Sequence, residues 1–177
     1  MSKTVLARFL RARDGAAIME FAFIVPIMLL LAAGITELGR AYHIYNSTNK
    51  LAVQYAEAWA DCKTACQAEM ASYTNSNVIS NITPVLNPGA LTLRMLWVTA
   101  NGASTTVAYS SPSGVSWATM TTAEQNVITK NLIPSGATGV IVSASYTFTP
   151  QYFPVEMANL MGSPLTAAYT VAQVVVN

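Results

Sequence analysis

Three patterns of hydrophobic and polar positions follow one another along the chain. Residues 16–36 form an almost unbroken apolar run. From there to about Met70, apolar side chains recur at steps of three and four residues, which is the period of an amphipathic helix. Beyond Gly89, apolar and polar residues alternate, as is typical of β-strands. This order predicts an α+β fold in which one long N-terminal helix packs on an antiparallel β-sheet.

The predicted helix runs from about Ala16 to about Met70. We expect the apolar stripe that follows the first run to pack against the sheet. That stripe consists of Leu38, Tyr42, Tyr45, Leu51, Tyr55, Trp59 and Cys62. Pro26 removes one backbone hydrogen bond and predicts a kink or a loosening near the start. The polar residues 46–49 are a second place where the helix can be interrupted.

The second half of the chain contains strand and turn signals. Strands are predicted at residues 91–100, 104–109, 139–149 and 165–176. Asn101-Gly102 is a strong hairpin signal between the first two of them. Residues 75–89 are rich in Asn and Pro, which indicates a loop before the first strand.

Two short helical segments are expected among these strands. Thr121 and Glu124 have the spacing of a capping box, which opens a helix to about Leu132. Residues 154–160 are expected to form a helical turn.

Residues 16–36 are long enough to cross a membrane. Twenty-one helical residues span about 31 Å, which matches a hydrocarbon core of about 30 Å. Basic residues precede this run, at Lys3, Arg8, Arg11 and Arg13. By the positive-inside bias, the N-terminus stays in the cytoplasm and the rest of the chain is exported. Just beyond the run, Glu37 and Arg40 have the spacing of an ion pair on a helix.

Three interpretations fit this apolar run. It is an uncut anchor, a signal peptide cleaved after the small residues Ala32-Ala33-Gly34, or a prepilin-type segment cut between Gly15 and Ala16. Glu20 separates them, because a carboxylate in an apolar helix costs about 2.5–3.5 kcal/mol on insertion scales. An anchor or a signal peptide gains nothing from that cost.

A cut before Ala16 gives Glu20 a use. The new amine then lies one helical turn from the carboxylate, and the two charges pair within one chain or between neighbouring helices. Such a pair offsets the cost of burial and fixes the axial register of packed helices. The competing interpretation is that the Glu20 side chain merely reaches the lipid headgroups.

Several motifs resemble one known family. They are Asp14-Gly15-Ala16-Ala17-Ile18-Met19-Glu20-Phe21-Ala22, the proline-bearing apolar run, and Glu37-Leu38-Gly39-Arg40 after it. Over residues 11–42 the chain closely resembles the TadE-like family, the pseudopilins or minor pilins of tight-adherence (Tad or Flp) pili. The resemblance extends more weakly to Tyr146–Pro150 and to Leu165–Ala168. It leaves open whether the chain is of the TadE or the TadF type.

The resemblance implies how the chain is divided. Residues 1–15 would be a cytoplasmic leader, 16–36 a transmembrane helix, 37–74 its exported continuation and 75–177 an exported β-rich domain. Gly15 would be the last leader residue and Ala16 the first mature one. Glu20 and Phe21 would then be the fifth and sixth mature residues and act in assembly and register, while Ala32, Ala33 and Gly34 allow close helix packing.

The resemblance also implies a place and partners. The protein would cross the bacterial inner membrane once, with its C-terminal domain in the periplasm, or be incorporated in an extracellular pilus. A prepilin peptidase would process it, and it would then act in the assembly, initiation or tip of a Tad (type IVc) pilus. Its partners would be membrane lipid, the inner-membrane assembly platform, other pseudopilins and the major pilin. The alternative is a generic membrane-tethered or secreted extracytoplasmic binding domain.

Little else in the sequence indicates chemistry. A net charge of +1 does not favour a nucleic-acid partner. One histidine and the lack of a nucleophile–base motif indicate a protein that is not an enzyme, with no cofactor and no metal. Cys62 and Cys66 are expected to form a local disulfide in an oxidising compartment, with free thiols next and a redox site last.

Overall fold

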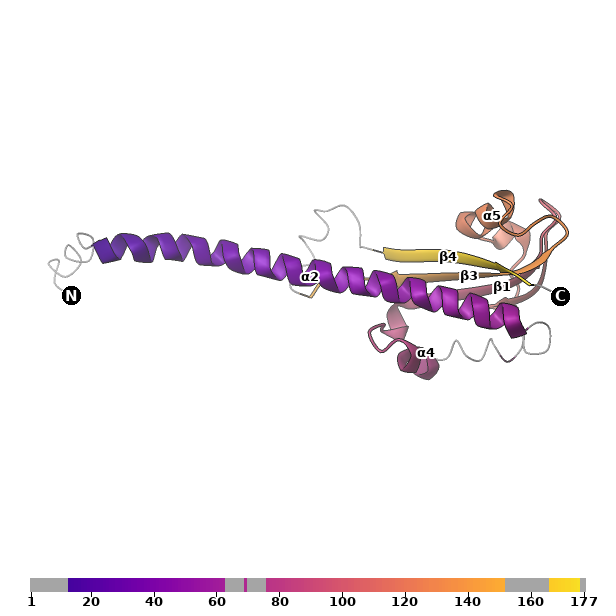
Figure 1. The fold of residues 1–177 in the computed structure, drawn as a ribbon, viewed down its shortest axis with the longest axis horizontal. Coiled ribbons are helices and arrows are strands. Elements are labelled where there is room, and N and C mark those ends of the chain that lie inside the picture. The colour runs from indigo at the N-terminus through magenta and orange to yellow at the C-terminus, as the bar shows by residue number, and fades with distance from the viewer. Residues whose placement is uncertain (1–12, 63–68, 70–75, 152–165, 176–177) are drawn as a thin grey trace. The chain divides into compact units, whose positions relative to one another are not determined.

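The computed structural model describes residues 13–62, 69, 76–151 and 166–175. The elements in order are α2 (Arg13–Cys62), α4 (Ser76–Ile82), the 3-10 turn η1 (Pro88–Ala90), β1 (Leu91–Thr99), β2 (Thr106–Ser111), the 3-10 turn η2 (Trp117–Thr119), α5 (Thr122–Thr129), β3 (Thr138–Thr147) and β4 (Thr166–Val174) (Figure 1). The predicted α+β arrangement of a long apolar helix and an antiparallel sheet is confirmed.

The chain divides into two compact units. The first contains Met1–Arg40 and Pro150–Gly162, and the second contains Ala41–Thr149 and Ser163–Asn177. The first unit holds the apolar part of α2. The second unit holds the whole sheet, together with the residues of α2 that pack on it.

The sheet has the strand order β2-β1-β3-β4, and every neighbouring pair is antiparallel. β1 and β3 pair in continuous register from Leu91↔Tyr146 to Thr99↔Thr138. The β1–β2 ladder shifts register between Trp97 and Val98, which is a β-bulge. Every strand begins and ends within two residues of its predicted bounds. β2 alone is shifted as a whole, by two residues toward the C-terminus.

Hydrophobic side chains fill both faces of the sheet. Met95 and Trp97 of β1 belong to the core on the α2 side, whereas Leu96 and Val98 belong to the core on the α5 side. Successive side chains of a strand point to opposite faces, so four consecutive buried residues require a cover on each face. α2 and α5 supply these covers.

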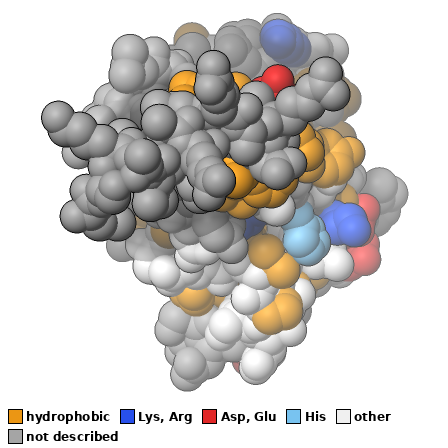
Figure 2. All heavy atoms as spheres, turned by 90° about the vertical axis from the view of Figure 1, so that its left-hand side faces the viewer, with side chains coloured by type: hydrophobic (Ala, Val, Ile, Leu, Met, Phe, Trp, Pro, Cys, Tyr) orange, Lys and Arg blue, Asp and Glu red, His pale blue; other side chains and the backbone are white. Residues whose placement is uncertain are grey.

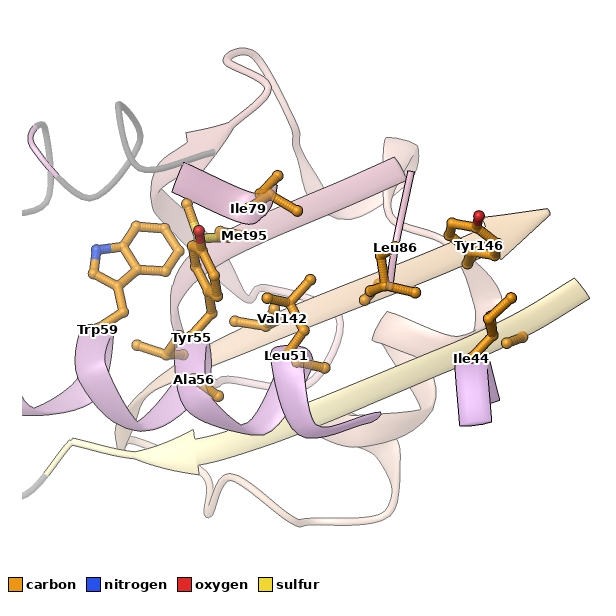
Figure 3. Close-up of a cluster of buried hydrophobic side chains, with 14 of the residues drawn as sticks. Ile44, Leu51, Tyr55, Ala56, Trp59, Ile79, Leu86, Met95, Val142 and Tyr146 are labelled. Atoms are coloured by element: carbon orange, nitrogen blue, oxygen red, sulfur yellow. The ribbon is translucent and has the colours of Figure 1, made fainter. Parts of the chain in front are cut away.

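The buried side chains of α2 are spaced three and four residues apart. Leu51, Tyr55 and Trp59 are 0–4% exposed. Figure 3 shows them projecting from α2 into the same cluster as Val142 and Met95. The expected packing of the helix stripe is therefore confirmed for this part. It is wrong for Leu38, Tyr42 and Tyr45, which are 72%, 67% and 49% exposed. Ile44, which the predicted stripe left out, is buried in the core instead.

The polar residues 46–49 do not interrupt α2. Ser47 and Thr48 are buried within it, and the Thr48 Oγ1 donates a hydrogen bond to the Ile44 carbonyl oxygen at 2.9 Å. Because this bond gives the buried hydroxyl a partner within the helix, the polar side chain does not need to interrupt α2 to form a hydrogen bond.

Residues 75–89 are not a simple loop, since α4 occupies Ser76–Ile82. Ile79 of this helix is 4% exposed and joins the α2-side core, and that burial outweighs the weak helix propensity of Asn and Ser. The described part of α2 runs from Arg13 to Cys62. The expected continuation through 63–68 and the helical turn at 154–160 lie outside the described residues.

Candidate functional site

The first unit presents an apolar helical surface. α2 contains a segment near the N-terminus that is long and apolar enough to cross a membrane, and none of that segment is buried inside the protein. Its large apolar side chains, from Ile18 to Leu38, are 54–72% exposed. Figure 2 shows hydrophobic side chains at the molecular surface in the view from the N-terminal side. An exposed apolar surface of this length is typical of helices that lie in lipid or pack on other helices.

Glu20 and Phe21 both point away from the protein in this segment. The Glu20 side chain is exposed, and the Phe21 side chain is 69% exposed. Gly15 and Ala16 lie on the helical backbone of α2. Four helical residues rise about 6 Å, so an amine on Ala16 lies one turn before the Glu20 backbone. The helix thus brings the predicted cut and the predicted register residue together, while Glu20 stays available to a neighbouring chain.

The small residues of the run are accessible to differing degrees. Ala32 is exposed, whereas Ala33 and Gly34 are half-buried. The Thr36 Oγ1 donates to the carbonyl oxygens of Ala32 at 3.1 Å and Ala33 at 2.8 Å. The hydroxyl therefore has acceptors within its own helix and does not need water at the end of the apolar run.

Glu37 has contacts that sequence reasoning missed. The expected pair with Arg40 forms, with 3.5 Å between Oε1 and Nη1, but Glu37 is only 6% exposed. The Glu37 Oε1 also accepts a hydrogen bond from the backbone N–H of Gln151 at 2.9 Å. Because the donor is a backbone amide 114 positions away, no residue type in the sequence could have predicted this hydrogen bond.

The expected disulfide is only partly visible. Cys62, the last residue of α2, is disulfide-bonded. Cys66 lies outside the described residues, so the pairing of Cys62 with Cys66 stays a prediction.

Two tyrosines of the second unit, Tyr55 and Tyr169, have raised pKa values. Burial raises the pKa of the Tyr55 phenol. Burial also raises the pKa of Tyr169, and the neighbouring Tyr45 phenol raises it further. The rings of Tyr45 and Tyr169 meet edge to face with 4.6 Å between centroids. The buried Tyr169 hydroxyl makes no hydrogen bond of good geometry with the described residues, although the Tyr45 phenol lies close enough to raise its pKa. Raised tyrosine pKa values keep these phenols neutral, so they do not act as charged groups at neutral pH.

Groups able to hold a metal are not seen in the part of the chain that the structure describes. There, no three or more His, Cys, Asp and Glu side chains gather closely enough for such a site. His43 is exposed on α2.

Comparison with known proteins identifies the N-terminal part of the chain. Residues 15–56 match the family model of TadE-like proteins. The comparisons with curated proteins and with solved structures give no match. The matched segment covers less than a quarter of the chain, begins at Gly15 and includes Glu20 and Glu37. The resemblance drawn from the sequence motifs is confirmed, and the chain contains a TadE-like segment.

Proposed function

From its TadE-like segment, we propose that this protein is a minor pilin, or pseudopilin, of a Tad (type IVc) pilus. A prepilin peptidase removes residues 1–15, and the mature helix stays in the inner membrane until it joins related pseudopilins and the major pilin. It then acts in the assembly, initiation or tip of the pilus. The exported sheet domain stays in the periplasm or is displayed on the fibre.

One observation carries the proposal. Glu20 is an exposed carboxylate on an apolar helical surface, one turn beyond the first residue expected in the mature chain. An anchor that met only lipid gains nothing from this carboxylate, whose cost reaches about 2.5–3.5 kcal/mol at the centre of an inserted helix. A neighbouring chain that brings an amine to Glu20 turns this cost into a register constraint, because the pair forms only at one axial offset.

The rest of the segment supports side-by-side packing. Ala32, Ala33 and Gly34 lack bulky side chains, so helix backbones can approach closely at this level. Thr36 satisfies its own hydroxyl within the helix. A tethered binding domain does not need these small residues and loses nothing by having them. It does lose stability in the membrane from the carboxylate of Glu20. The Glu20 substitution therefore distinguishes the two functions.

The test compares two carboxylates of one helix. Glu20→Ala is expected to abolish piliation in the native host while the protein persists in the membrane. Glu57→Ala is the matched control, since Glu57 is also exposed on α2 but lies beyond the apolar run. Surface pili are counted by electron microscopy, and the protein is quantified in membrane fractions. Normal piliation in the Glu20→Ala strain would contradict the register role.

A further inference from the structure

Glu37 is buried where a carboxylate is costly. It is 6% exposed and follows the membrane-spanning run of α2. Acidic side chains are almost never this buried without a partner, because removing the charge from water costs several kcal/mol. Its contacts must therefore offset that cost.

Two contacts meet the same oxygen. The Gln151 backbone N–H donates to Oε1 at 2.9 Å, and the Arg40 Nη1 lies 3.5 Å from it. The first is a good charge-assisted hydrogen bond, whereas the second is long and comes from a side chain that is 33% exposed. The other oxygen, Oε2, is buried and has no hydrogen-bond partner among the described residues. The amide of Gln151 is therefore the strongest of these contacts.

This arrangement favours positioning over stability. An apolar residue of similar shape would bury no unpaired oxygen, but it would leave the Gln151 N–H and the Arg40 side chain without this acceptor. Only a side chain with an acceptor oxygen can bind the backbone N–H of Gln151, which lies four residues after the end of β3 at Thr147.

We propose that Glu37 is a positioning residue for pilus assembly, which fastens the chain leaving β3 to α2 just beyond the membrane-spanning run. This inference rests on the proposed pilin function. The acceptor oxygen of Glu37, rather than its charge, is the essential feature. Without this contact, the Gln151 N–H has no acceptor on α2, and the chain after β3 is no longer held to the helix that packs in the pilus.

The contact is tested on the purified full chain in detergent micelles, by hydrogen exchange of the Gln151 amide. Glu37→Leu is expected to speed this exchange by about ten- to a hundredfold, the equivalent of one hydrogen bond to a charged group. Glu37→Gln keeps an acceptor oxygen and is expected to stay within about tenfold of the native rate. Glu57→Leu, at an exposed position on α2, is the control and should leave the rate unchanged.

The assembly role is tested with the same variants in the native host. Glu37→Leu is expected to reduce piliation strongly, and Glu37→Gln to restore it. The inference is overturned if the native Gln151 amide exchanges freely, if Glu37→Gln behaves like Glu37→Leu, or if Glu37→Leu cells are normally piliated. The exchange experiment does not depend on pili. Failure of the pilin function would therefore appear as native protein absent from pili, with Gln151 protection intact.

Discussion

At the scale of single residues, Gly139 shows how tightly β3 packs. A Cβ at this position would lie 2.5 Å from Ile133 Cδ1 and 3.0 Å from the Gln173 carbonyl oxygen. Ile133 is fully buried, so it has little room to move. We expect Gly139→Ala to lower the free energy of unfolding by about 1–3 kcal/mol through overpacking.

The control for this substitution is Gly89→Ala, where the nearest atom to the new Cβ is Asn87 Oδ1 at 3.4 Å. That variant should unfold at the native denaturant midpoint or slightly above it. Denaturant unfolding of the full chain in micelles measures both. Equal denaturant midpoints for the two variants would contradict this prediction, because they would show that the Ile133 side chain moves away from the new Cβ without loss of stability.

Tyr169 makes the stability of the sheet domain depend on pH in the alkaline range. Below about pH 10, the ordinary tyrosine pKa, the phenol is protonated in both folded and unfolded chains. Above it the unfolded chain ionises, while burial and the neighbouring Tyr45 raise the pKa of Tyr169 and hold its proton in the folded chain. Stability therefore falls as pH rises beyond about 10, and Tyr169→Phe should reduce that fall.

At neutral pH, Tyr169→Phe should change the free energy of unfolding by no more than about 1 kcal/mol, because the buried hydroxyl makes no hydrogen bond of good geometry with the described residues. Tyr146→Phe is the control, since the Tyr146 hydroxyl accepts from the Asn87 amide at 3.4 Å. Thermal unfolding from pH 7 to pH 11 measures both. A Tyr169→Phe variant with an unchanged alkaline slope would contradict the pKa assignment.

At the scale of elements, one partly buried ion pair joins α5 to the sheet. The Arg94 Nε and Nη2 atoms of β1 donate to the two carboxylate oxygens of Glu124 at 2.9 and 3.1 Å. Glu124 is fully buried at the start of α5 and also accepts from the Thr121 backbone N–H at 2.8 Å. One side chain therefore caps the helix and fixes its start on β1.

Removing only the cation should be the costly change. Arg94→Met leaves the carboxylate buried without its partner, and we expect a loss of about 3–5 kcal/mol in the free energy of unfolding. The double variant Arg94→Met/Glu124→Leu should lose less than the sum of the single changes, because no charge remains buried. A double-mutant cycle by denaturant unfolding checks this, and strictly additive losses would refute the coupling.

The sequence predicted those elements that carry local signals. The capping box of Thr121 and Glu124 marks the start of α5, and alternation marks β1, β3 and β4 within a few residues. These signals act over a few neighbouring positions, so they are readable without a fold. The apolar run, long enough to cross a membrane, was readable for the same reason, and the role of Glu20 within it stays a prediction.

The sequence missed what tertiary contacts decide. α4 lies in a stretch rich in Asn and Ser, and its Ile79 is buried in the core on the α2 side, a tertiary contact that the local sequence does not show. Tyr42 fits the helical period as well as Tyr55 does, yet one is exposed and the other buried. The bond from Gln151 to Glu37 uses a backbone amide, which every residue except proline has.

At the scale of the whole molecule, the chain combines two environments. The second unit buries its apolar side chains in two cores of its own, one on each face of the sheet. The first unit exposes its apolar side chains along α2. A sheet domain with its own cores and an exposed apolar helix on one chain agree with the proposed insertion first in a membrane and then in a fibre.

The most direct test of this account is the N-terminal sequence and intact mass of the protein from the membranes of its native host. The account predicts a chain that begins at Ala16, with its amine one turn from Glu20. A chain that begins at Ile35, after cleavage behind Gly34, would mean a secreted domain without the helix and would contradict pilus assembly. An intact start at Met1, in a host with an active prepilin peptidase, would leave a tethered domain instead.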